Sequence, residues 1–271
     1  MSPAYRSLDV TRDGAVAHVT LTGPGRGNAM GPATWDELAP AFAELDADDA
    51  VRAVVLRGSG DHFSYGLDLM AMMPELGELV MGTITARPRQ KLLSLIGKMQ
   101  AAAGAPAACR KPVIAAIDGW CIGGGLDLAA ACDIRICSSR ARFSLREIKL
   151  AIVADLGSLQ RLPAIIGQGH TRQLAFTGED IDAARAQQIG LVNDTHDSPE
   201  ALYEAAAALA DRIARNSPVT ARGAKEVLNY SQGRTPDEGL RHVALWNSAF
   251  LQSTDLAEAF AAYMERREPK Y

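Results

Sequence analysis

The sequence predicts an α/β protein whose last third is almost wholly helical. Short apolar runs such as 113–117 are typical of buried strands. In the first two-thirds of the chain these runs alternate with segments of helical period. Beyond Pro199, by contrast, helical segments follow one another without an intervening strand. Strands with crossover helices predict a layered core, to which a helical C-terminal region is joined.

The individual elements follow from turn signals, caps and apolar spacing. In the N-terminal half we expect a hairpin (5–10 and 15–21), a helix (32–45), a strand (51–56), a helix beginning near Asp68, and two or more helices within 75–108, interrupted near Arg87 and Pro88. Further on we expect strands at 113–117 and 132–137, a helix from 164, a short helix closed by Gly190, and helices at 200–215, 218–230, 236–252 and 255–267. This pattern divides the chain into a core (1–199) and a helical region (200–271).

The composition describes an ordinary globular protein. Of 271 residues, 48% are apolar and 22% are charged, with a net charge of −4, which excludes a disordered chain. The slight acidity disfavours non-specific nucleic-acid binding, which depends on a positive field. No apolar run reaches membrane-spanning length, and MSPAYRSLDV lacks the pattern of a signal peptide. The four cysteines form no CxxC pair, so we expect buried reduced thiols in a cytoplasmic protein.

Two glycine loops each precede a helical segment. Gly66 and Leu67 lie in one loop, and Gly123 and Gly124 lie in the other. Backbone N–H groups at a helix start are unpaired, and the helix dipole favours negative charge there. Two such donors at one point would form an oxyanion hole; the alternative is that both loops are plain glycine turns. The spacings GxGxxG and GxxxxGK[ST] are absent, so neither a dinucleotide site nor a P-loop is predicted.

Three acids lie in apolar surroundings near the second loop. Asp127 stands within LDLAAA, Glu147 follows Arg146, and Asp155 stands within IVADLGS. Each has a structural alternative: a local helix cap for Asp127, a surface ion pair for Glu147, and an N-cap for Asp155. Three neighbouring carboxylates favour acid–base chemistry, because close carboxylates spread their pKa values. Ser-His hydrolysis is disfavoured, because no serine has an evident histidine partner.

The segments GDHFSYGLDLM (60–70) and KPVIAAIDGWCIGGGLDLAAACDIRI (111–136) resemble the two signature segments of the enoyl-CoA hydratase/isomerase (crotonase) superfamily. GRGNAM, AFTGEDIDAARAQQIGLVN and AYMERREPKY extend the resemblance over nearly the whole chain. It implies the crotonase fold, a spiral of ββα units with a helical C-terminal trimerisation region. It also implies acyl-CoA substrates whose thioester oxygen is held by the N–H groups of Leu67 and Gly124. No metal or separate cofactor is implied, since coenzyme A is part of the substrate.

The acids resemble those of one subgroup. Hydratases of the superfamily have Glu at positions 127 and 147 and Gly at position 155. Here Asp127, Glu147 and Asp155 match the acidic trio of the Δ3,5-Δ2,4-dienoyl-CoA isomerases, which implies an isomerase of fatty acid oxidation. Moving a 3,5-diene to a 2,4-diene removes a proton at C2 and adds one at C6. We assign Glu147 to C2, Asp155 to C6 and Asp127 to orienting or tuning the pair; the alternative is hydration of a 2-enoyl-CoA by a water between Asp127 and Glu147.

The resemblance also implies residues that bind coenzyme A. Arg26 matches a position that meets the nucleotide end, and Ser64 and Tyr65 would border the adenine. Tyr263 and Lys270 lie in a C-terminal segment that in this family often covers a neighbouring subunit's ligand; surface charge and packing are the alternatives for both. We expect a homotrimer or a dimer of trimers, that is, a hexamer. A non-catalytic acyl-CoA-binding homologue is disfavoured by the complete set of acids and loops, and an RNA-binding relative by the acidic balance.

Overall fold

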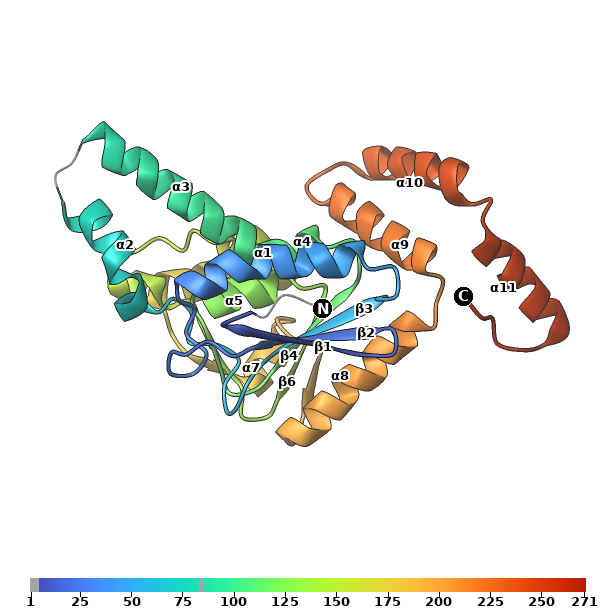
Figure 1. The fold of residues 1–271 in the computed structure, drawn as a ribbon, viewed down its shortest axis with the longest axis horizontal. Coiled ribbons are helices and arrows are strands. Elements are labelled where there is room, and N and C mark those ends of the chain that lie inside the picture. The colour runs from blue at the N-terminus through green and yellow to red at the C-terminus, as the bar shows by residue number, and fades with distance from the viewer. Residues whose placement is uncertain (1–4, 83–84) are drawn as a thin grey trace.

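A six-stranded sheet runs through the centre of the molecule (Figure 1). The computed structural model describes residues 5–82 and 85–271. The strand order is β1-β2-β3-β4-β6-β9, in which β1 and β2 are antiparallel and every later pair is parallel. A smaller sheet joins β5, β7 and β8. The bounds are β1 Leu8–Asp13, β2 Val16–Leu21, β3 Ala53–Gly58, β4 Val113–Ile117, β5 Trp120–Ile122, β6 Ile134–Ser138, β7 Arg142–Ser144, β8 Ile181–Asp182 and β9 Asp194–His196.

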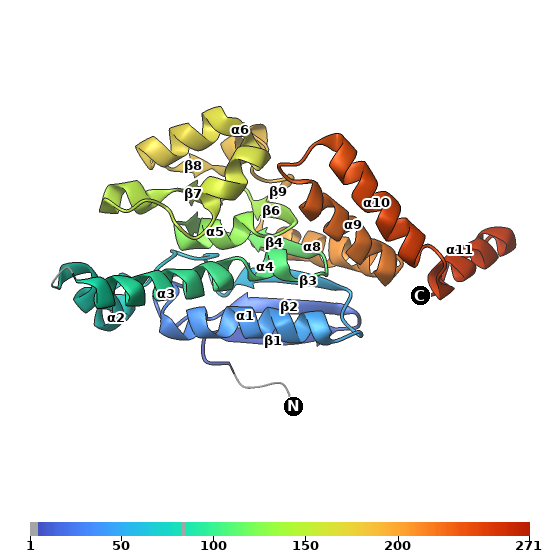
Figure 2. The same ribbon diagram turned by 90° about the horizontal axis from the view of Figure 1, so that it is seen from above.

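Helices cover both faces of the large sheet (Figures 1 and 2). They are α1 Pro32–Ala47, α2 Leu69–Met81, α3 Ala86–Ala103, α4 Ala105–Ala108, α5 Gly124–Ala130, the 3-10 helix Arg146–Leu150, α6 Ser158–Thr177, α7 Ala183–Gln188 and α8 Pro199–Ala214. In β3, Val54 and Leu56 enter the core shared with α1, whereas Ala53 and Val55 face α8. This alternation follows from the two-residue period of a strand. A parallel sheet buried on both sides explains why its strands are nearly continuous apolar runs.

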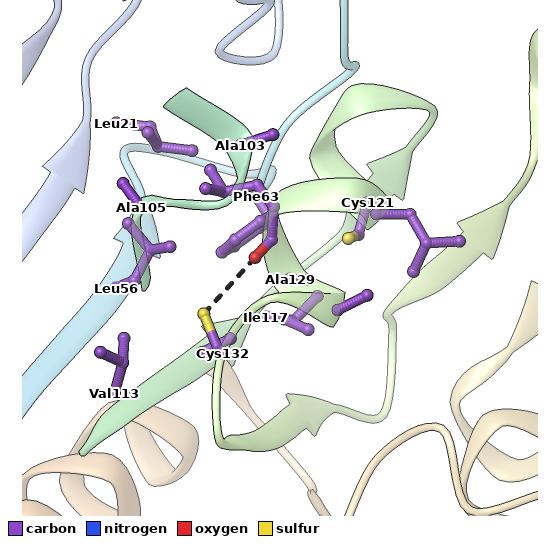
Figure 3. Packing of buried hydrophobic residues seen from close by; sticks show 14 of the residues in the cluster. Leu21, Leu56, Phe63, Ala103, Ala105, Val113, Ile117, Cys121, Ala129 and Cys132 are labelled. Carbon is purple, nitrogen blue, oxygen red and sulfur yellow. Dashed lines mark hydrogen bonds between the residues drawn. The ribbon is translucent and has the colours of Figure 1, made fainter. Parts of the chain in front are cut away.

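The larger core lies between the sheet and helices α1, α3 and α5. Figure 3 shows part of it. Phe63 of the loop after β3, Ile117 of β4 and Ala129 of α5 are fully buried within it. Nearby, the Cys132 thiol donates to the carbonyl oxygen of Leu128 at 3.6 Å. All four cysteines are buried and free, and burial raises the pKa of each thiol. They pack as small apolar side chains, in agreement with the prediction from their sequence context.

The last three helices leave the sheet and extend to one end of the molecule (Figures 1 and 2). They are α9 Pro218–Ser231, α10 Pro236–Phe250 and α11 Thr254–Glu265. Lys225 anchors α9 to the core, because its buried ammonium group donates to Asp133 Oδ2 at 2.7 Å and to the carbonyl oxygen of Lys111 at 2.9 Å. The expected division of the chain at residue 200 stays a prediction. The helix at that position, α8, packs its apolar side on β2, β3, β4, β6 and β9.

Most expected elements are present, and two differ in an informative way. The interruption predicted near Pro88 falls before Ala86, so Pro88 lies in the first turn of α3, where a missing N–H is tolerated. Residues 83 and 84, within the expected helical stretch, lie outside the described residues. The helix expected from 164 already begins at Ser158. Among the residues that the structure describes, no helix is long and apolar enough to cross a bilayer.

Candidate active site

An isolated bridge between Ser64 and Cys121 brings the two glycine loops together. The Ser64 N–H donates to Trp120 O at 2.9 Å, and the Ile122 N–H donates to Ser64 O at 3.1 Å. The loops are then so close that a Cβ on Gly66 would lie 2.9 Å from the backbone nitrogen of Gly124. Gly66 also has a φ of +78°, which glycine adopts without strain. Only a glycine at this position allows the two loops to approach.

The N–H groups of Leu67 and Gly124 are the two candidate donors of an oxyanion hole. Within residues 5–82 and 85–271, neither nitrogen has a hydrogen-bond acceptor. Gly124 is the first residue of α5, so its N–H precedes the helical ladder and lies at the positive end of the helix dipole. Both neighbours of Leu67 bond to Met30: the Met30 N–H donates to Gly66 O, and the Asp68 N–H donates to Met30 O. In this strand-like bridge the Leu67 N–H therefore points away from Met30.

Asn28 organises the first loop and was not singled out from the sequence. Its side-chain amide donates to Ser59 O at 2.8 Å and His62 O at 2.7 Å, and its Oδ1 accepts from the Ser59 hydroxyl at 2.8 Å. Asn28 itself has a φ of +54°, a conformation that asparagine tolerates better than most residues. These bonds fix residues 59–63 immediately before the Gly66 turn. The signal available in the sequence was the asparagine between glycine and alanine in GRGNAM.

Asp127 is buried in α5 and is held by Ser158, which lies 31 positions later in the sequence. Its Oδ1 accepts from both the backbone N–H and the hydroxyl of Ser158, each at 2.6 Å. Its Oδ2 is buried without a hydrogen-bond partner among the described residues. Burial raises the pKa of Asp127, the two bonds from Ser158 lower it, and the charge of Asp155 raises it further; the net shift is upward. The carboxylate caps a distant helix, not its own.

Glu147 lies in the 3-10 helix with its carboxylate beside the second glycine loop. A Cβ on Gly123 would lie 3.2 Å from Glu147 Oε1, so the acid stands next to the residue preceding the Gly124 donor. Oε2 is buried and has no partner within the described part of the chain. Burial first, and the charges of Asp127 and Asp155 in addition, raise the pKa of Glu147 to about 7. A carboxyl group with this pKa can both accept and donate a proton near neutral pH.

Asp155 lies in the loop between the 3-10 helix and α6. It is partly buried, and burial raises its pKa. Its charge raises the pKa of both Asp127 and Glu147, so the three carboxyl groups form one electrostatic cluster. Its backbone carbonyl accepts from the side-chain amide of Gln100 at 2.7 Å. Asp155 is not an N-cap, because Gly157 occupies that position of α6.

The structure separates the expected coenzyme A residues into two groups. Arg26 is exposed, and it lies beside Tyr65, because Tyr65 N donates to Gly27 O at 2.9 Å and a Cβ on Gly27 would lie 2.5 Å from the Tyr65 ring. Ser64 is fully buried; its hydroxyl donates to Asn28 O and accepts from Gly66 N. The Ser64 side chain therefore offers no surface to an adenine ring, and any contact there would use the backbone.

Tyr263 and Lys270 lie far from the acids of the same chain. Tyr263 is exposed on α11, and the Lys270 N–H donates to Glu258 Oε1 at 2.7 Å. In both ribbon views α11 lies at one end of the molecule, whereas α2 and α3 mark the opposite end and α5 lies between (Figures 1 and 2). A contact of Tyr263 or Lys270 with a ligand bound by a neighbouring subunit stays a prediction.

The described residues include no group of three or more His, Cys, Asp and Glu side chains arranged to hold a metal ion. The expectation of metal-free and cofactor-free catalysis stays a prediction. What the geometry provides is a pair of backbone donors next to carboxyl groups with raised pKa values. Such a site can stabilise negative charge on a carbonyl oxygen while protons move to and from nearby carbon atoms.

The mixed sheet with its covering helices and the helical C-terminal region have the architecture of the crotonase class. The family model described as enoyl-CoA hydratase/isomerase matches residues 11–271, and the chain belongs to this family. The family acts on acyl-CoA thioesters. The fold class predicted from the resemblance is thereby confirmed.

Relatives and solved structures agree with this assignment. The chain is 41% identical to a peroxisomal Delta(3,5)-Delta(2,4)-dienoyl-CoA isomerase of Arabidopsis thaliana, over 99% of this chain and 98% of the relative. It is 40% identical to a mitochondrial protein of the same name from Homo sapiens, over 98% of this chain and 82% of the relative. The crystal structure of an enoyl-CoA hydratase from Bacillus anthracis superposes with a TM-score of 0.88 at 29% identity, over 98% of this chain and 99% of that one.

Proposed function

We propose that this enzyme isomerises 3,5-dienoyl-CoA to 2,4-dienoyl-CoA in fatty acid oxidation. The observation that carries the proposal is a third carboxyl group, Asp155, in electrostatic contact with Asp127 and Glu147. Moving two double bonds requires proton transfer at two carbons that are four bonds apart, which two separate acid–base groups can serve. The names of the relatives from Arabidopsis thaliana and Homo sapiens support the same reaction.

Glu147 is assigned to C2 because it stands beside the oxyanion donors. Its ionised carboxylate removes a proton from C2, and the electron pair delocalises into the thioester to give an extended enolate. The N–H groups of Leu67 and Gly124 stabilise the developing oxygen charge. Protonated Asp155 then donates to C6, the double bonds move to positions 2 and 4, and the thioester carbonyl re-forms. A proton passed from Glu147 to Asp155 restores the starting state, so the reaction is redox-neutral and consumes no co-reactant.

The proposed cycle requires the Glu147–Asp155 pair to hold one proton. The pKa of Glu147 is raised to about 7, and burial raises the pKa of Asp155 from its ordinary value. Close carboxyl groups titrate as a unit, in which loss of the first proton makes loss of the second harder. Between the two macroscopic pKa values the pair therefore carries a single proton, and Asp127 adds negative charge that helps to retain it. The reactive form is the one in which this proton is on Asp155 and Glu147 is ionised.

Arg26 and Tyr65 are proposed to contact the nucleotide part of coenzyme A. Support comes from their adjacency, because the loop that carries exposed Arg26 rests on the Tyr65 ring. A guanidinium can pair with phosphate, and an aromatic ring can stack on adenine. Substitution of Arg26 by Ala is expected to raise KM with little change in kcat, since this contact is remote from the carbons that exchange protons.

The test is incubation of the enzyme with a 3,5-dienoyl-CoA while the absorbance of the conjugated 2,4-dienoyl thioester is followed. The expected result is growth of the red-shifted band without any added metal or redox cofactor. Absence of the band, together with hydration of a 2-enoyl-CoA, would overturn the proposal.

Hydration of a 2-enoyl-CoA is the second candidate. It is favoured by two buried oxygens, Asp127 Oδ2 and Glu147 Oε2, which lack partners among the described residues and are each able to accept a hydrogen bond from water. The hydratase name of the Bacillus anthracis structure is consistent with it. Incubation with a 2-enoyl-CoA would reveal this activity, because hydration of the double bond removes the absorbance of the conjugated enoyl thioester. The presence of Asp155 makes isomerisation the leading proposal.

We further propose that the chain assembles as a trimer, or as a dimer of trimers, through its C-terminal helices. These helices carry exposed apolar side chains, among them Leu228, Leu240, Leu245, Phe250, Leu251, Phe260 and Met264. A hollow of about 500 Å³ between α9, α10 and the start of α11 is lined by Trp246 and other apolar residues. Apolar surface of this kind is typical of subunit interfaces. Light scattering of the purified protein distinguishes monomer, trimer and hexamer.

The expected cytoplasmic location stays a prediction, because the names of two relatives specify peroxisomes and mitochondria.

A further inference from the structure

We propose that Ser158 is a positioning residue of the site: it holds Asp127 as the N-terminal cap of α6 and thereby fixes the loop that carries Asp155. The inference rests on the proposed function, because the acids that Ser158 positions are those assigned to proton transfer. Ser158 itself touches neither substrate nor a reacting atom in this assignment.

The Ser158–Asp127 contact consists of two short hydrogen bonds to a single oxygen. The N–H and the hydroxyl of Ser158 both lie 2.6 Å from Asp127 Oδ1. Ser158 is fully buried and Asp127 is 1% exposed, so neither bond competes with bulk water. Bonds from neutral donors to a buried carboxylate are charge-assisted and are stronger than neutral pairs. The contact therefore fixes one oxygen of Asp127, whereas Oδ2 is buried without a partner among the described residues.

The backbone of Gly157 explains why α6 takes its cap from another helix. Gly157 occupies the N-cap position and has no side chain to accept from the first N–H groups of α6. Its φ of +128° disfavours any other residue, and a Cβ there would lie 1.8 Å from Arg161 Nη1. A local Ser, Thr or Asp cap would therefore strain the backbone at position 157. Asp127 of α5 supplies the missing acceptor, and the dipole of α6 favours its negative charge.

The same contact limits the motion of Asp155. Ser158 follows Asp155 by three residues, with Leu156 and Gly157 between them, and buried Leu156 packs in the core. On the other side of the loop, Gln100 of α3 binds the Asp155 carbonyl at 2.7 Å. The segment around Asp155 is therefore held from α3 and from α5. Loss of either tether gives Asp155 more freedom relative to Glu147.

Ser158 also influences the charge balance of the acids. The charged groups that act on Asp127 are Asp155 from the preceding loop and Arg161 from α6. Asp127 acts in turn on Glu147 of the 3-10 helix, and the Cys121 thiol of β5, whose pKa burial raises, stays protonated. Burial raises the pKa of Asp127 and both bonds from Ser158 lower it. Removing the hydroxyl raises the pKa of Asp127 further and reduces its average negative charge. The pKa of Glu147, raised in part by that charge, then falls.

The chain offers a matched control for this contact. The Ser138 hydroxyl donates to Asp118 Oδ1 at 2.6 Å, and both residues are as buried as Ser158 and Asp127. Asp118 is paired with Arg140 and has no role in the proposed reaction. Ser138→Ala therefore removes the same kind of buried serine–aspartate bond away from the acids. A difference between Ser158→Ala and Ser138→Ala isolates the effect of position from the loss of a buried hydroxyl.

The experiment compares wild type, Ser158→Ala, Ser158→Thr and Ser138→Ala. Steady-state rates on a 3,5-dienoyl-CoA give kcat, KM and the pH profile of kcat/KM. Urea unfolding gives the free energy of unfolding. Carbon-13 NMR of labelled aspartate gives the pKa of Asp127, whose signal is assigned by its loss in Asp127→Asn. Ser158→Ala is expected to lose about tenfold in kcat, the factor that one buried hydrogen bond is worth, with KM little changed. The falling limb of its pH profile shifts to lower pH and the pKa of Asp127 rises. Ser158→Thr, which keeps the hydroxyl, restores most of kcat.

Ser138→Ala is expected to lose stability without changing kcat or the pH profile. The proposal is overturned if Ser158→Ala matches Ser138→Ala in kcat, pH profile and the pKa of Asp127, a comparison that holds even where Ser158→Thr is too large to fold. If wild type shows no dienoyl isomerisation, the proposed function fails while the NMR titration still decides whether Ser158 controls Asp127. The two failures are thereby distinguished.

Discussion

Gln100, on α3, donates a hydrogen bond from its side-chain amide to the backbone carbonyl of Asp155 at 2.7 Å. The two residues are 55 positions apart, and α3 otherwise packs on α1, α2, α4 and α5. A residue of another helix therefore holds the backbone of the acid assigned to C6. The backbone at Asp155 is thus held by α3, whereas Glu147 is held by the 3-10 helix in which it lies.

Gln100→Ala is expected to lower kcat for dienoyl isomerisation by about threefold, because water can replace the donor to the exposed Asp155 carbonyl but the loop gains freedom. Exchange of the C2 protons with deuterated water, which depends on Glu147, is expected to continue. Gln90→Ala, on the exposed surface of the same helix, is the control. An equal loss of isomerisation and of C2 exchange in Gln100→Ala would contradict separate support of the two acids.

Asp155→Asn is expected to abolish isomerisation while exchange at C2 partly survives, because an amide cannot donate a carboxylic proton to C6. Glu147→Gln is expected to abolish both reactions, since no base then remains at C2. Proton exchange followed by NMR or mass spectrometry, beside the absorbance assay, separates the two steps. Loss of both reactions in Asp155→Asn would show that the acids do not act at separate carbons.

The pH profile of kcat/KM is expected to be bell-shaped with its falling limb near pH 7, the value to which burial and neighbouring charge raise the pKa of Glu147. The rising limb reflects loss of the first proton from the Glu147–Asp155 pair, and the falling limb reflects loss of the second. Initial rates at subsaturating substrate over acidic to alkaline pH give the profile. Activity that keeps rising well above neutral pH would argue against a shared proton.

Asp127→Asn provides the companion measurement. The amide keeps an acceptor for Ser158 but removes a negative charge that raises the pKa of Glu147. A Glu147 with less negative charge nearby ionises more readily, so its pKa falls and the falling limb moves to lower pH. A limb that stays in place would mean that Asp127 does not tune Glu147.

Gly66→Ala tests the oxyanion hole. A Cβ on Gly66 would lie 2.6 Å from Ile122 O and 2.9 Å from Gly124 N, so the two loops must separate. Loss of one donor from an oxyanion hole typically costs a factor of about 100 to 1,000 in kcat. Gly60→Ala is the control, because Gly60 has a similar φ of +62° but no atom within 4 Å of the added Cβ. It shares the backbone strain and should keep kcat; equal losses in both variants would point to strain alone.

Elements with a strong local signal were predictable from the sequence. The apolar run of β4, the helices opened by Pro32, Pro218 and Pro236, and the start of α2 after Asp68 all occur where local patterns predict them. The acids and glycine loops were found for the same reason, because a carboxylate in an apolar run and a glycine before a helix are visible one residue at a time. The roles of Ser64, Ser158 and Gln100 were not predictable, because each acts on a residue distant in sequence.

The start of α6 shows the limit most clearly. Gly157 gives no local cap signal, so the sequence predicts a later helix start, near residue 164. The helix begins at Ser158 because Asp127, from α5, accepts its first N–H. No spacing rule relates positions 127 and 158.

The sequence by itself therefore determined the fold class, the two glycine loops and the three acids, because each depends on local propensity, apolar period or residue type. Only the tertiary structure decided that the Ser64–Cys121 bridge joins the two loops, that Asp127 caps α6, and that Gln100 holds Asp155. The physical reason is that hydrogen bonds between distant segments depend on how helices and strands pack in three dimensions. Local sequence fixes which groups a segment carries, and packing decides which of them meet.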